Sequence, residues 1–344
     1  MPYIIPIFIA HEGCPHSCIF CDQHSISGRS RQEVSAEEVA LTIEEWLQRR
    51  PGRRDQVQVA FYGGSFTALP RARQQQLLGA VAPFLAQGLV DGVRVSTRPD
   101  CIDQECLELL ADHGVRVVEL GVQSLDEAVL KGAGRGHGAE DVAEAVGLLR
   151  GYPFQLGLQL MLGLPGQSFG SLRRTMARVV GLAPEMVRIY PVLVIAGSGL
   201  ERAFRQGRFV PLSLGKAVLQ ARYMKKQCDR NGIRVIRMGL QPGPSLEDSL
   251  VAGPYHPAFG ELVLAREMLQ QTRRLLAQGQ GRAGEAEEEQ HLVIHSKDQS
   301  IFRGLRSANI QRLSELGLLA SFSLGCDDRL PRYQVRRAAL PGEA

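Results

Sequence analysis

Short runs of aliphatic and β-branched residues alternate along the first 190 residues with longer stretches in which apolar positions recur at helical spacing. This alternation is typical of βαβ units that build a parallel sheet. Six strands are too few for a complete eight-stranded barrel, so the pattern predicts a partial, TIM-like (βα)6 barrel of the α/β class. The expected strands are Ile4–Ile9, Val57–Tyr62, Val93–Ser96, Val115–Leu120, Phe154–Met161 and Met186–Tyr190. The expected helices run from Ser35 to about Pro51 and over 70–86, 103–113, 139–150 and 168–182.

The pattern loosens after Tyr190, and composition divides the remainder of the chain. Ser213 can cap a helix that reaches Asn231, and Ile233–Met238 is one further strand candidate. We expect a core barrel over 1–240 and an extension with a helix over 241–280. Residues 281–291 are rich in Gly and Glu, which is typical of a linker. The last segment, 292–344, is too short for an independent core and is expected to form a small α/β cap.

The composition is typical of a soluble globular enzyme, because 44% of the 344 residues are hydrophobic and 22% are charged. A net charge of +4 does not by itself indicate a nucleic-acid-binding protein. No apolar run approaches the ~20 residues of a membrane span, and we interpret the apolar residues 1–10 as a first strand and not as a signal peptide. Seven cysteines, an odd number, favour a reducing compartment over a disulfide framework. We therefore expect a cytoplasmic protein without a membrane partner.

Three of the cysteines follow the first expected strand at the spacing Cys-x-x-x-Cys-x-x-Cys. They are Cys14, Cys18 and Cys21. Soft thiolates favour zinc, copper(I) or iron–sulfur clusters over hard ions. Three thiolates are one fewer than a closed structural site normally uses, so an iron–sulfur cluster held by them keeps one iron open. The other four cysteines are scattered, but zinc stays an alternative because a histidine can supply a fourth ligand. The neighbouring histidines are His11, His16 and His24.

The cysteine spacing, with the aromatic Phe20 directly before the third cysteine, resembles the signature of radical S-adenosylmethionine (radical SAM) enzymes. The resemblance implies a 4Fe-4S cluster whose open iron is chelated by the amino and carboxylate groups of S-adenosylmethionine. It also implies a reducing electron donor of the flavodoxin or ferredoxin type. Reductive cleavage of the cofactor then gives methionine and a 5′-deoxyadenosyl radical, which abstracts a hydrogen atom from the substrate.

Later motifs narrow this resemblance to the radical domain of the Elongator catalytic subunit. They occur in order at the ends of expected strands and cover about residues 4–240. The core is more distantly similar to oxygen-independent coproporphyrinogen III oxidase. An Elongator-like domain implies a role in tRNA modification, with tRNA wobble uridine as the substrate. The motifs are Gly63-Gly-Ser-Phe-Thr67, Ser96-Thr-Arg-Pro-Asp100, Glu119-Leu-Gly-Val-Gln-Ser124, Gly134-Arg-Gly-His137, Gly163-Leu-Pro-Gly166 and Ile189-Tyr-Pro191.

The resemblance also implies which residues contact S-adenosylmethionine. The turn after the second strand would contact its amino group, Arg135 its carboxylate, and Gln123 and Gln159 its ribose. Gln159 stands where the coproporphyrinogen oxidase pattern has a ribose-binding aspartate. Met161 and Gly163 would lie against the adenine, and the run Val192–Ile195 would close its other side. The full set of expected cofactor contacts is Phe20, Gly63, Gly64, Ser65, Gln123, Arg135, Gln159, Met161 and Gly163. No residue is assigned to hydrogen abstraction. Arg135 as a solvated charge, and Gln159 and Met161 as inward core positions, are the alternatives.

Two departures from the Elongator pattern matter. Ser96 stands where that pattern has Glu, so a cofactor contact through the acid is lost or replaced. The acetyltransferase domain that follows the radical domain in that family finds no room in 344 residues, so acetyl transfer by this chain is not expected. A haem-binding chaperone related to coproporphyrinogen oxidase and a zinc-bound RNA-binding module are therefore retained as alternatives. His256 lies in a Pro-rich loop that is explained by a rigid turn more simply than by contact with substrate.

Basic residues gather in two places, at the end of the first helix and along the later helix and strand. Such patches are used by nucleic-acid-binding proteins for phosphates, but cations near a helix carboxyl end are also favourable because of the helix dipole. No alternation of aromatic and basic residues marks a stacking platform. The first group is Arg49, Arg50, Arg53 and Arg54, and the second is Arg222, Lys225, Lys226, Arg230, Arg234 and Arg237.

Overall fold

The computed structural model describes residues 2–16, 18–22, 33–49, 56–279 and 290–338. The chain forms two compact units. Unit 1 comprises Met1–Ala217 and Met224–Tyr255, and unit 2 comprises Val218–Tyr223 and His256–Ala344. Most of the expected linker 281–291, together with His24, Arg50, Arg53 and Arg54, lies outside the described residues. Among the helices that are described, none combines the length and the apolar character needed to cross a membrane.

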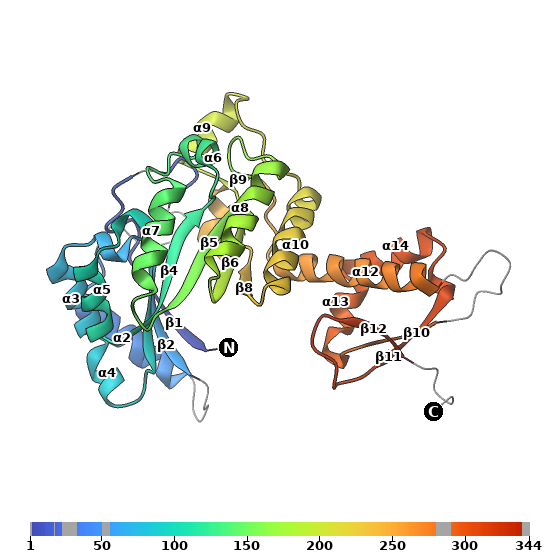
Figure 1. Ribbon diagram of the computed structural model, residues 1–344, viewed down its shortest axis with the longest axis horizontal. Helices are drawn as coiled ribbons and strands as arrows, with labels where there is room; N and C mark the ends of the chain where they lie inside the picture. The colour runs from blue at the N-terminus through green and yellow to red at the C-terminus, as the bar shows by residue number, and fades with distance from the viewer. Residues whose placement is uncertain (1, 17, 23–32, 50–55, 280–289, 339–344) are drawn as a thin grey trace. The chain divides into compact units, whose positions relative to one another are not determined.

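Unit 1 is built on a curled parallel sheet, with strand order β1-β2-β3-β4-β5-β6-β8 (Figure 1). The α/β partial barrel is confirmed, and the strand candidate at 233–238 supplies the seventh strand because it pairs with β6 at the edge. The strands are β1 (Tyr3–Phe8), β2 (Val57–Tyr62), β3 (Gly92–Thr97), β4 (Val115–Gln123), β5 (Gln155–Leu162), β6 (Met186–Pro191) and β8 (Arg234–Met238). A short antiparallel pair, β7 (Val194–Ile195) with β9 (Leu250–Ala252), was not expected.

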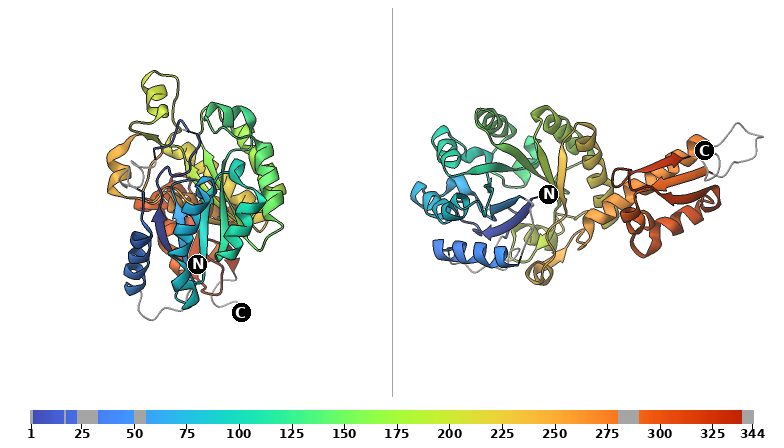
Figure 2. Two further views of the ribbon diagram at one scale, coloured as in Figure 1. Left: turned by 90° about the vertical axis from the view of Figure 1, so that its left-hand side faces the viewer. Right: turned by 90° about the horizontal axis from the view of Figure 1, so that it is seen from below.

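Helices follow the strands and cover the outer face of the curled sheet (Figure 2). They are α2 (Ala36–Gln48), α3 (Arg71–Gly79), α4 (Ala82–Ala86), α5 (Gln104–Asp112), α6 (Glu127–Gly132), α7 (Ala139–Leu149), α8 (Phe169–Leu182), α9 (Gly199–Arg205), α10 (Leu214–Arg230) and α11 (Pro244–Ser249). The capping box forms as expected, since Ser35 N donates to Glu38 Oε2 at 2.7 Å and Glu38 N donates to Ser35 Oγ at 3.1 Å. The single helix expected over 70–86 is two helices, with Pro83 in the first turn of the second.

The core of unit 1 lies between the sheet and these helices. Strand β3 is buried at all six positions, as expected inside a parallel sheet, although Arg94, Ser96 and Thr97 are polar. Helix α7 buries one side against the sheet, through Val142, Ala145, Val146 and Leu149. Burial of each Val or Leu side chain contributes about 1.5 to 3 kcal/mol to stability. This packing holds the strands in place and so fixes where their carboxyl ends lie.

In its described residues, unit 2 contains positions 218–223 of α10, one long helix, three strands and two short helices. Its elements are α12 (Phe259–Gly279), β10 (Gln290–Ile294), α13 (Gln299–Arg303), α14 (Ala308–Glu315), β11 (Phe322–Cys326) and β12 (Val335–Ala338). The sheet has the order β11-β10-β12, with β11 parallel and β12 antiparallel to β10. Its core includes Met268, Leu276, Leu292 and Phe302, so α12 packs with the small sheet in one hydrophobic cluster.

Candidate functional site

The loop that carries the three cysteines packs on the carboxyl end of β2. Gly13 has a φ of +72°, and Ser65 N donates to Glu12 O at 2.9 Å. Cys14 is exposed, Cys18 is buried and Cys21 is half-buried. Cys14 Sγ lies 3.6 Å from the hydroxyl of Ser65, so the structure brings the first cysteine to the predicted Gly-Gly-Ser turn.

In this structure the thiols are not gathered around one point. No three His, Cys, Asp or Glu side chains among the described residues converge closely enough to hold a metal ion. His11 lies 4.0 Å from Asp22, and the ring of His16 lies against Gly136. The donor set of three soft thiols still suits an iron–sulfur cluster.

The glycines of the turn are explained by the cysteine loop itself. Gly63 has a φ of +89°, which favours glycine. A Cβ atom at Gly64 would lie 2.5 Å from Ile9 O and closer still to Glu12 O. Any other residue at position 64 would therefore push the cysteine loop away from β2.

Gln123 is the last residue of β4, and both its backbone conformation and its side-chain environment are unusual. Its φ is +64°, a left-handed conformation that is strained for a non-glycine residue. The residue is only 8% exposed, and its Oε1 atom is buried without a hydrogen-bond partner among the described residues. An unsatisfied buried acceptor costs about 1 to 3 kcal/mol. A ligand hydroxyl that donates to this oxygen would remove that cost, so Gln123 fits the expected ribose contact.

Arg135 is 6% exposed, so it is not the solvated surface charge that was considered as an alternative. Its Nη1 atom donates to Cys18 Sγ at 3.0 Å, its Nη2 atom donates to Gly121 O, and its Nε atom donates to His137 Nε2 at 3.2 Å. Burial and the charge of Arg135 hold the pKa of His137 below its usual value, which leaves the ring neutral and able to accept this bond. Three of the five guanidinium N–H groups are used, so two remain for a carboxylate.

Gln159 belongs to a buried polar network that crosses the strands. Its Nε2 atom donates to Ser96 Oγ at 3.0 Å and to Glu119 Oε2 at 3.2 Å. Both amide hydrogens are therefore occupied, and Oε1 is left as a fixed acceptor. The chain departs from the Elongator pattern at Ser96 and from the coproporphyrinogen oxidase pattern at Gln159. These two residues are thus direct hydrogen-bond partners.

Glu119 is the centre of this network and is 1% exposed. It forms ion pairs of 2.6 Å with Arg94 and with Arg188. Burial raises the pKa of Glu119, but Arg188 and Arg94 outweigh it and hold that pKa below its usual value. Arg188 also donates to Tyr62 at 2.6 Å, and burial followed by the charge of Glu119 raises the pKa of that phenol.

No role was expected from the sequence for Glu119, Arg94 or Arg188. A signal was present, because each charge lies inside a strand of a parallel sheet, where both faces are usually buried. Such charges are almost never buried unless they are paired. Their pairing across three different strands could not be read from local spacing.

Some of the residues expected near the adenine lie with Phe20 in one apolar cluster, whereas Leu193 and Ile195 belong to another. Phe20, Val192 and Val194 are buried members of the first cluster, and Met161 packs against them. Gly163 has a φ of +83°, and its N–H donates to Gln167 Oε1 at 2.6 Å. The structure thus brings together the third-cysteine loop, the end of β5 and the segment after β6.

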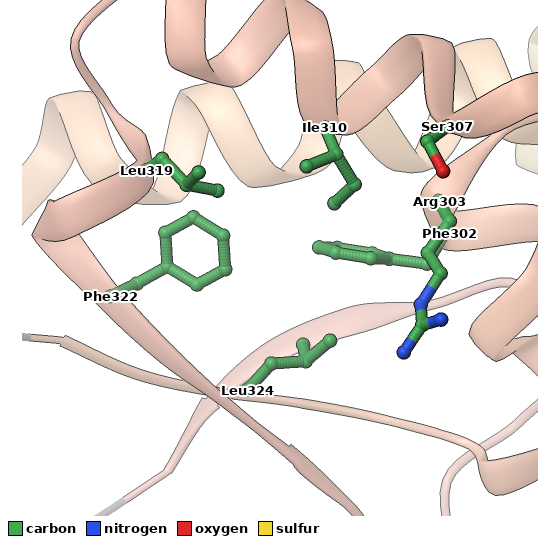
Figure 3. Close-up of a pocket in the computed structure, with 7 residues that line it drawn as sticks. All are labelled: Phe302, Arg303, Ser307, Ile310, Leu319, Phe322 and Leu324. Atoms are coloured by element: carbon green, nitrogen blue, oxygen red, sulfur yellow. The ribbon is translucent and has the colours of Figure 1, made fainter.

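Two further features lie in unit 2. A pocket of about 410 Å³ is lined by Phe302, Arg303, Ser307, Ile310, Leu319, Phe322 and Leu324, none of which was predicted as a site residue (Figure 3). His256 Nδ1 accepts a bond of 3.0 Å from Ala258 N, which agrees with the rigid-turn explanation for this histidine.

Comparison with known proteins adds four findings. The Radical SAM superfamily profile matches residues 8–179, and the Radical_SAM C-terminal domain profile matches residues 184–271. A tRNA uridine(34) acetyltransferase of Dehalococcoides mccartyi (strain CBDB1) is 30% identical over 235 residues, which cover 59% of this chain and 51% of the relative. A heme chaperone HemW of Lactococcus lactis is 27% identical over 183 residues, which cover 53% of this chain and 47% of the relative. The alignments thus span about half the length of these curated relatives.

Among solved structures, the archaeal Elp3 of Methanocaldococcus infernus with an N-terminal deletion superposes with a TM-score of 0.64 and 23% identity. The superposition covers 78% of this chain and 63% of that one. At this level of identity the likeness supports the fold.

Proposed function

The chain belongs to the radical SAM superfamily, and we propose that it is a tRNA-modifying enzyme that uses a 4Fe-4S cluster and S-adenosylmethionine. Cys14, Cys18 and Cys21 would hold the cluster. When bound, the pair would supply reductive cleavage of the cofactor to methionine and a 5′-deoxyadenosyl radical able to abstract a hydrogen atom from the substrate. The electron would come from a flavodoxin or ferredoxin type of donor, in the cytoplasm.

The observation that carries the proposal is the unpartnered oxygen of Gln123 at the carboxyl end of β4. It lies in the same strand as Gly121, whose carbonyl accepts from Arg135. A ribose hydroxyl could donate to this oxygen. The fixed acceptor of Gln159 would take a second hydroxyl, as a carboxylate would. The amide at position 159 can therefore replace the aspartate of the coproporphyrinogen oxidase pattern.

Arg135 would serve two partners. Its Nη1 atom donates to Cys18 Sγ and so orients that sulfur. Its remaining N–H groups would hold the carboxylate of S-adenosylmethionine. The apolar cluster around Phe20, Met161 and Val192 would exclude water from the adenine side.

The substrate proposal rests on the curated relative named tRNA uridine(34) acetyltransferase. We propose tRNA wobble uridine as the substrate of the radical step. Acetyl transfer is not proposed for this chain, because the alignment covers only 51% of that relative.

The test is formation of 5′-deoxyadenosine by the anaerobically reconstituted, dithionite-reduced protein, with and without unfractionated tRNA. Product that requires Cys18, shown by a Cys18→Ala control, and that increases with tRNA supports the proposal. No product from a protein with an intact cluster, together with stoichiometric haem binding, would favour a haem chaperone like the HemW relative. Zinc in place of iron after reconstitution would contradict the cluster.

A further inference from the structure

Four arginines of unit 2 lie close to one another on three helices. Arg222 belongs to α10, Arg266 and Arg273 belong to α12, and Arg312 belongs to α14. Arg266 and Arg273 are seven residues apart, which is about two helical turns, so they project from one face of α12. Burial, and after it the charges of Arg222, Arg273 and Arg312, lower the pKa of Arg266. We call these four residues the arginine cluster.

Asn309 fixes the position of α14 in this group. Its Nδ2 atom donates to Ala265 O and to Phe302 O, each at 2.9 Å. Arg312 lies one helical turn after Asn309 and therefore on the same side of α14. Ala265 is the neighbour of Arg266 in the sequence. The buried amide of Asn309 therefore holds the part of α14 that carries Arg312 near the part of α12 that carries Arg266.

Carboxylates neutralise only part of this charge. Arg222 pairs with Glu267 at 2.5 Å, and Arg312 pairs with Glu315 at 2.7 Å. Arg266 and Arg273 form no hydrogen bond or ion pair with any residue that the structure describes. The Nε atoms of Arg222 and Arg266 are buried and have no partner there. The described cluster therefore holds two positive charges in excess and two unsatisfied N–H donors.

An anion would relieve both costs. A buried donor without a partner costs about 1 to 3 kcal/mol, and gathered like charges repel. The residues are arginines and not lysines, and the guanidinium fork matches the geometry of phosphate oxygens. Arg266 and Arg273 are about 10 Å apart along the helix axis, which favours a ligand with several phosphates over one small anion. Gln270 lies between them on the same face and adds a neutral amide.

We propose that the arginine cluster binds backbone phosphates of tRNA, so that unit 2 is an RNA-binding part of this protein. The inference rests on the proposed function, because tRNA is the substrate proposed there. It adds that affinity for RNA comes from contacts outside the radical SAM site. Phosphate contacts fix the register and orientation of an RNA without reading its sequence, so the cluster would bind different tRNAs alike.

The experiment measures binding of unfractionated tRNA to the full chain, without cluster reconstitution, over a range of salt concentrations. Arg266→Gln with Arg273→Gln should weaken binding about tenfold and reduce the slope of log affinity against log salt by about 1 to 2. Arg329→Gln with Arg336→Gln is the matched control, because both residues are exposed in unit 2 and the change in net charge is the same. That control should change the affinity by less than about twofold.

A second variant keeps the test independent of folding. Arg266→Lys with Arg273→Lys retains the charge and removes the guanidinium fork, so its affinity should fall between those of the parent and the Gln variant. Equal weakening by the Gln variant and its control would overturn the proposal, since binding would then follow net charge alone. Loss of binding to phosphatidylserine vesicles with unchanged tRNA binding would overturn it in favour of a membrane surface.

Failure of the proposed function gives a different result. If the reconstituted enzyme makes no 5′-deoxyadenosine while tRNA binding still depends on Arg266 and Arg273, the RNA surface stands and the chemistry is wrong. If 5′-deoxyadenosine forms and tRNA binding ignores the arginine cluster, the radical enzyme stands and this inference is wrong.

Discussion

Two groups of arginines in this chain differ in how far carboxylates and other polar groups neutralise and hydrogen-bond them. Arg94 and Arg188 lie inside the sheet of unit 1, where both pair with Glu119. Arg94 Nη2 also donates to Gln58 Oε1, and Arg188 Nη2 also donates to the Tyr62 hydroxyl. In the arginine cluster of unit 2, two of the four guanidinium groups have no described partner. A charge buried among strands must be paired in the folded protein, because an unpaired buried charge is strongly destabilising. A half-exposed charge stays partly solvated, so it can remain unpaired until a ligand binds.

Gln123 shows the same distinction within unit 1. Gln159, Ser96 and Glu119 satisfy one another across the strands, but the Oε1 atom of Gln123 meets no donor among the described residues. Most polar groups of this network are thus bonded within the fold, although Arg94 Nε has no partner among the described residues. Two other unbonded sets, Gln123 Oε1 and the Nε atoms of Arg222 and Arg266, lie where we propose ligands.

The largest expected effect comes from removing the charge that both buried arginines share. Glu119→Gln keeps the shape of the side chain and leaves Arg94 and Arg188 without a carboxylate, so it should lower the free energy of unfolding by about 3 to 5 kcal/mol. Urea denaturation measures this. Glu105→Gln, which breaks an exposed pair with Arg71, is the control and should cost less than about 1 kcal/mol. Equal costs would show that burial does not separate the two kinds of arginine pair.

Acid should remove the same contribution. The pKa of Glu119 is held below its usual value, so its contribution to stability is present above the unfolded pKa of about 4.3 and is lost as the pH falls through the folded pKa. The difference in unfolding free energy between the parent and Glu119→Gln should therefore narrow as the pH falls below about 5, through the unfolded pKa and then the lower folded pKa. A difference that stays constant over this range would mean that the carboxylate is not the source of the effect.

Gln123→Ala tests the unpartnered oxygen. Affinity for S-adenosylmethionine should fall about tenfold in the reconstituted protein, while the stability of the ligand-free protein stays equal or rises, because the amide oxygen meets no described donor. Calorimetric titration and urea denaturation measure the two quantities. Gln74→Ala is the matched control, since Gln74 also has a buried unpaired oxygen but bonds Thr67 O and Leu69 O through its nitrogen. It should lower stability by about 1 kcal/mol and leave cofactor affinity unchanged.

The smallest effect is expected from Ser96→Ala. Without the Ser96 hydroxyl, one amide hydrogen of Gln159 loses its acceptor and the side chain can rotate. Affinity for S-adenosylmethionine should fall about threefold, which corresponds to less than about 1 kcal/mol. Ser96→Thr keeps the hydroxyl and should restore the affinity. Failure of this rescue would assign the loss to packing and not to orientation of the amide.

Much of unit 1 could be predicted from the sequence because its signals are local. The strands from β2 to β6 lie within a few residues of the expected ranges, and the Ser35 capping box forms as expected. The motifs follow their strands directly, and parallel strands bring their carboxyl ends to one edge. The pair β7 with β9 was missed because it joins segments more than 50 residues apart, of two and three residues.

The candidate site likewise has one part that local sequence signals predict and another that depends on contacts between residues far apart in the chain. The sequence predicted Cys14, Cys18 and Cys21 as cluster ligands from their spacing, and Gln123 and Arg135 as cofactor contacts from the resemblance of their motifs to the radical SAM family. It could not show that Gln159 bonds Ser96, since those residues are 63 positions apart. It also left open whether Arg135 is exposed, because a charge in a Gly-rich loop has no local periodicity that indicates burial.

The sequence by itself determined the α/β partial barrel, the family and the residue types at the ends of its strands, because periodicity and motif spacing are properties of neighbouring residues. Only the tertiary structure decided which polar groups are satisfied. Glu119 pairs with its two arginines, Gln123 keeps an acceptor that no described residue bonds, and Arg266 lies near arginines from two other helices. Hydrogen bonds and charge pairs depend on distances across elements, and those distances exist only once the chain has folded.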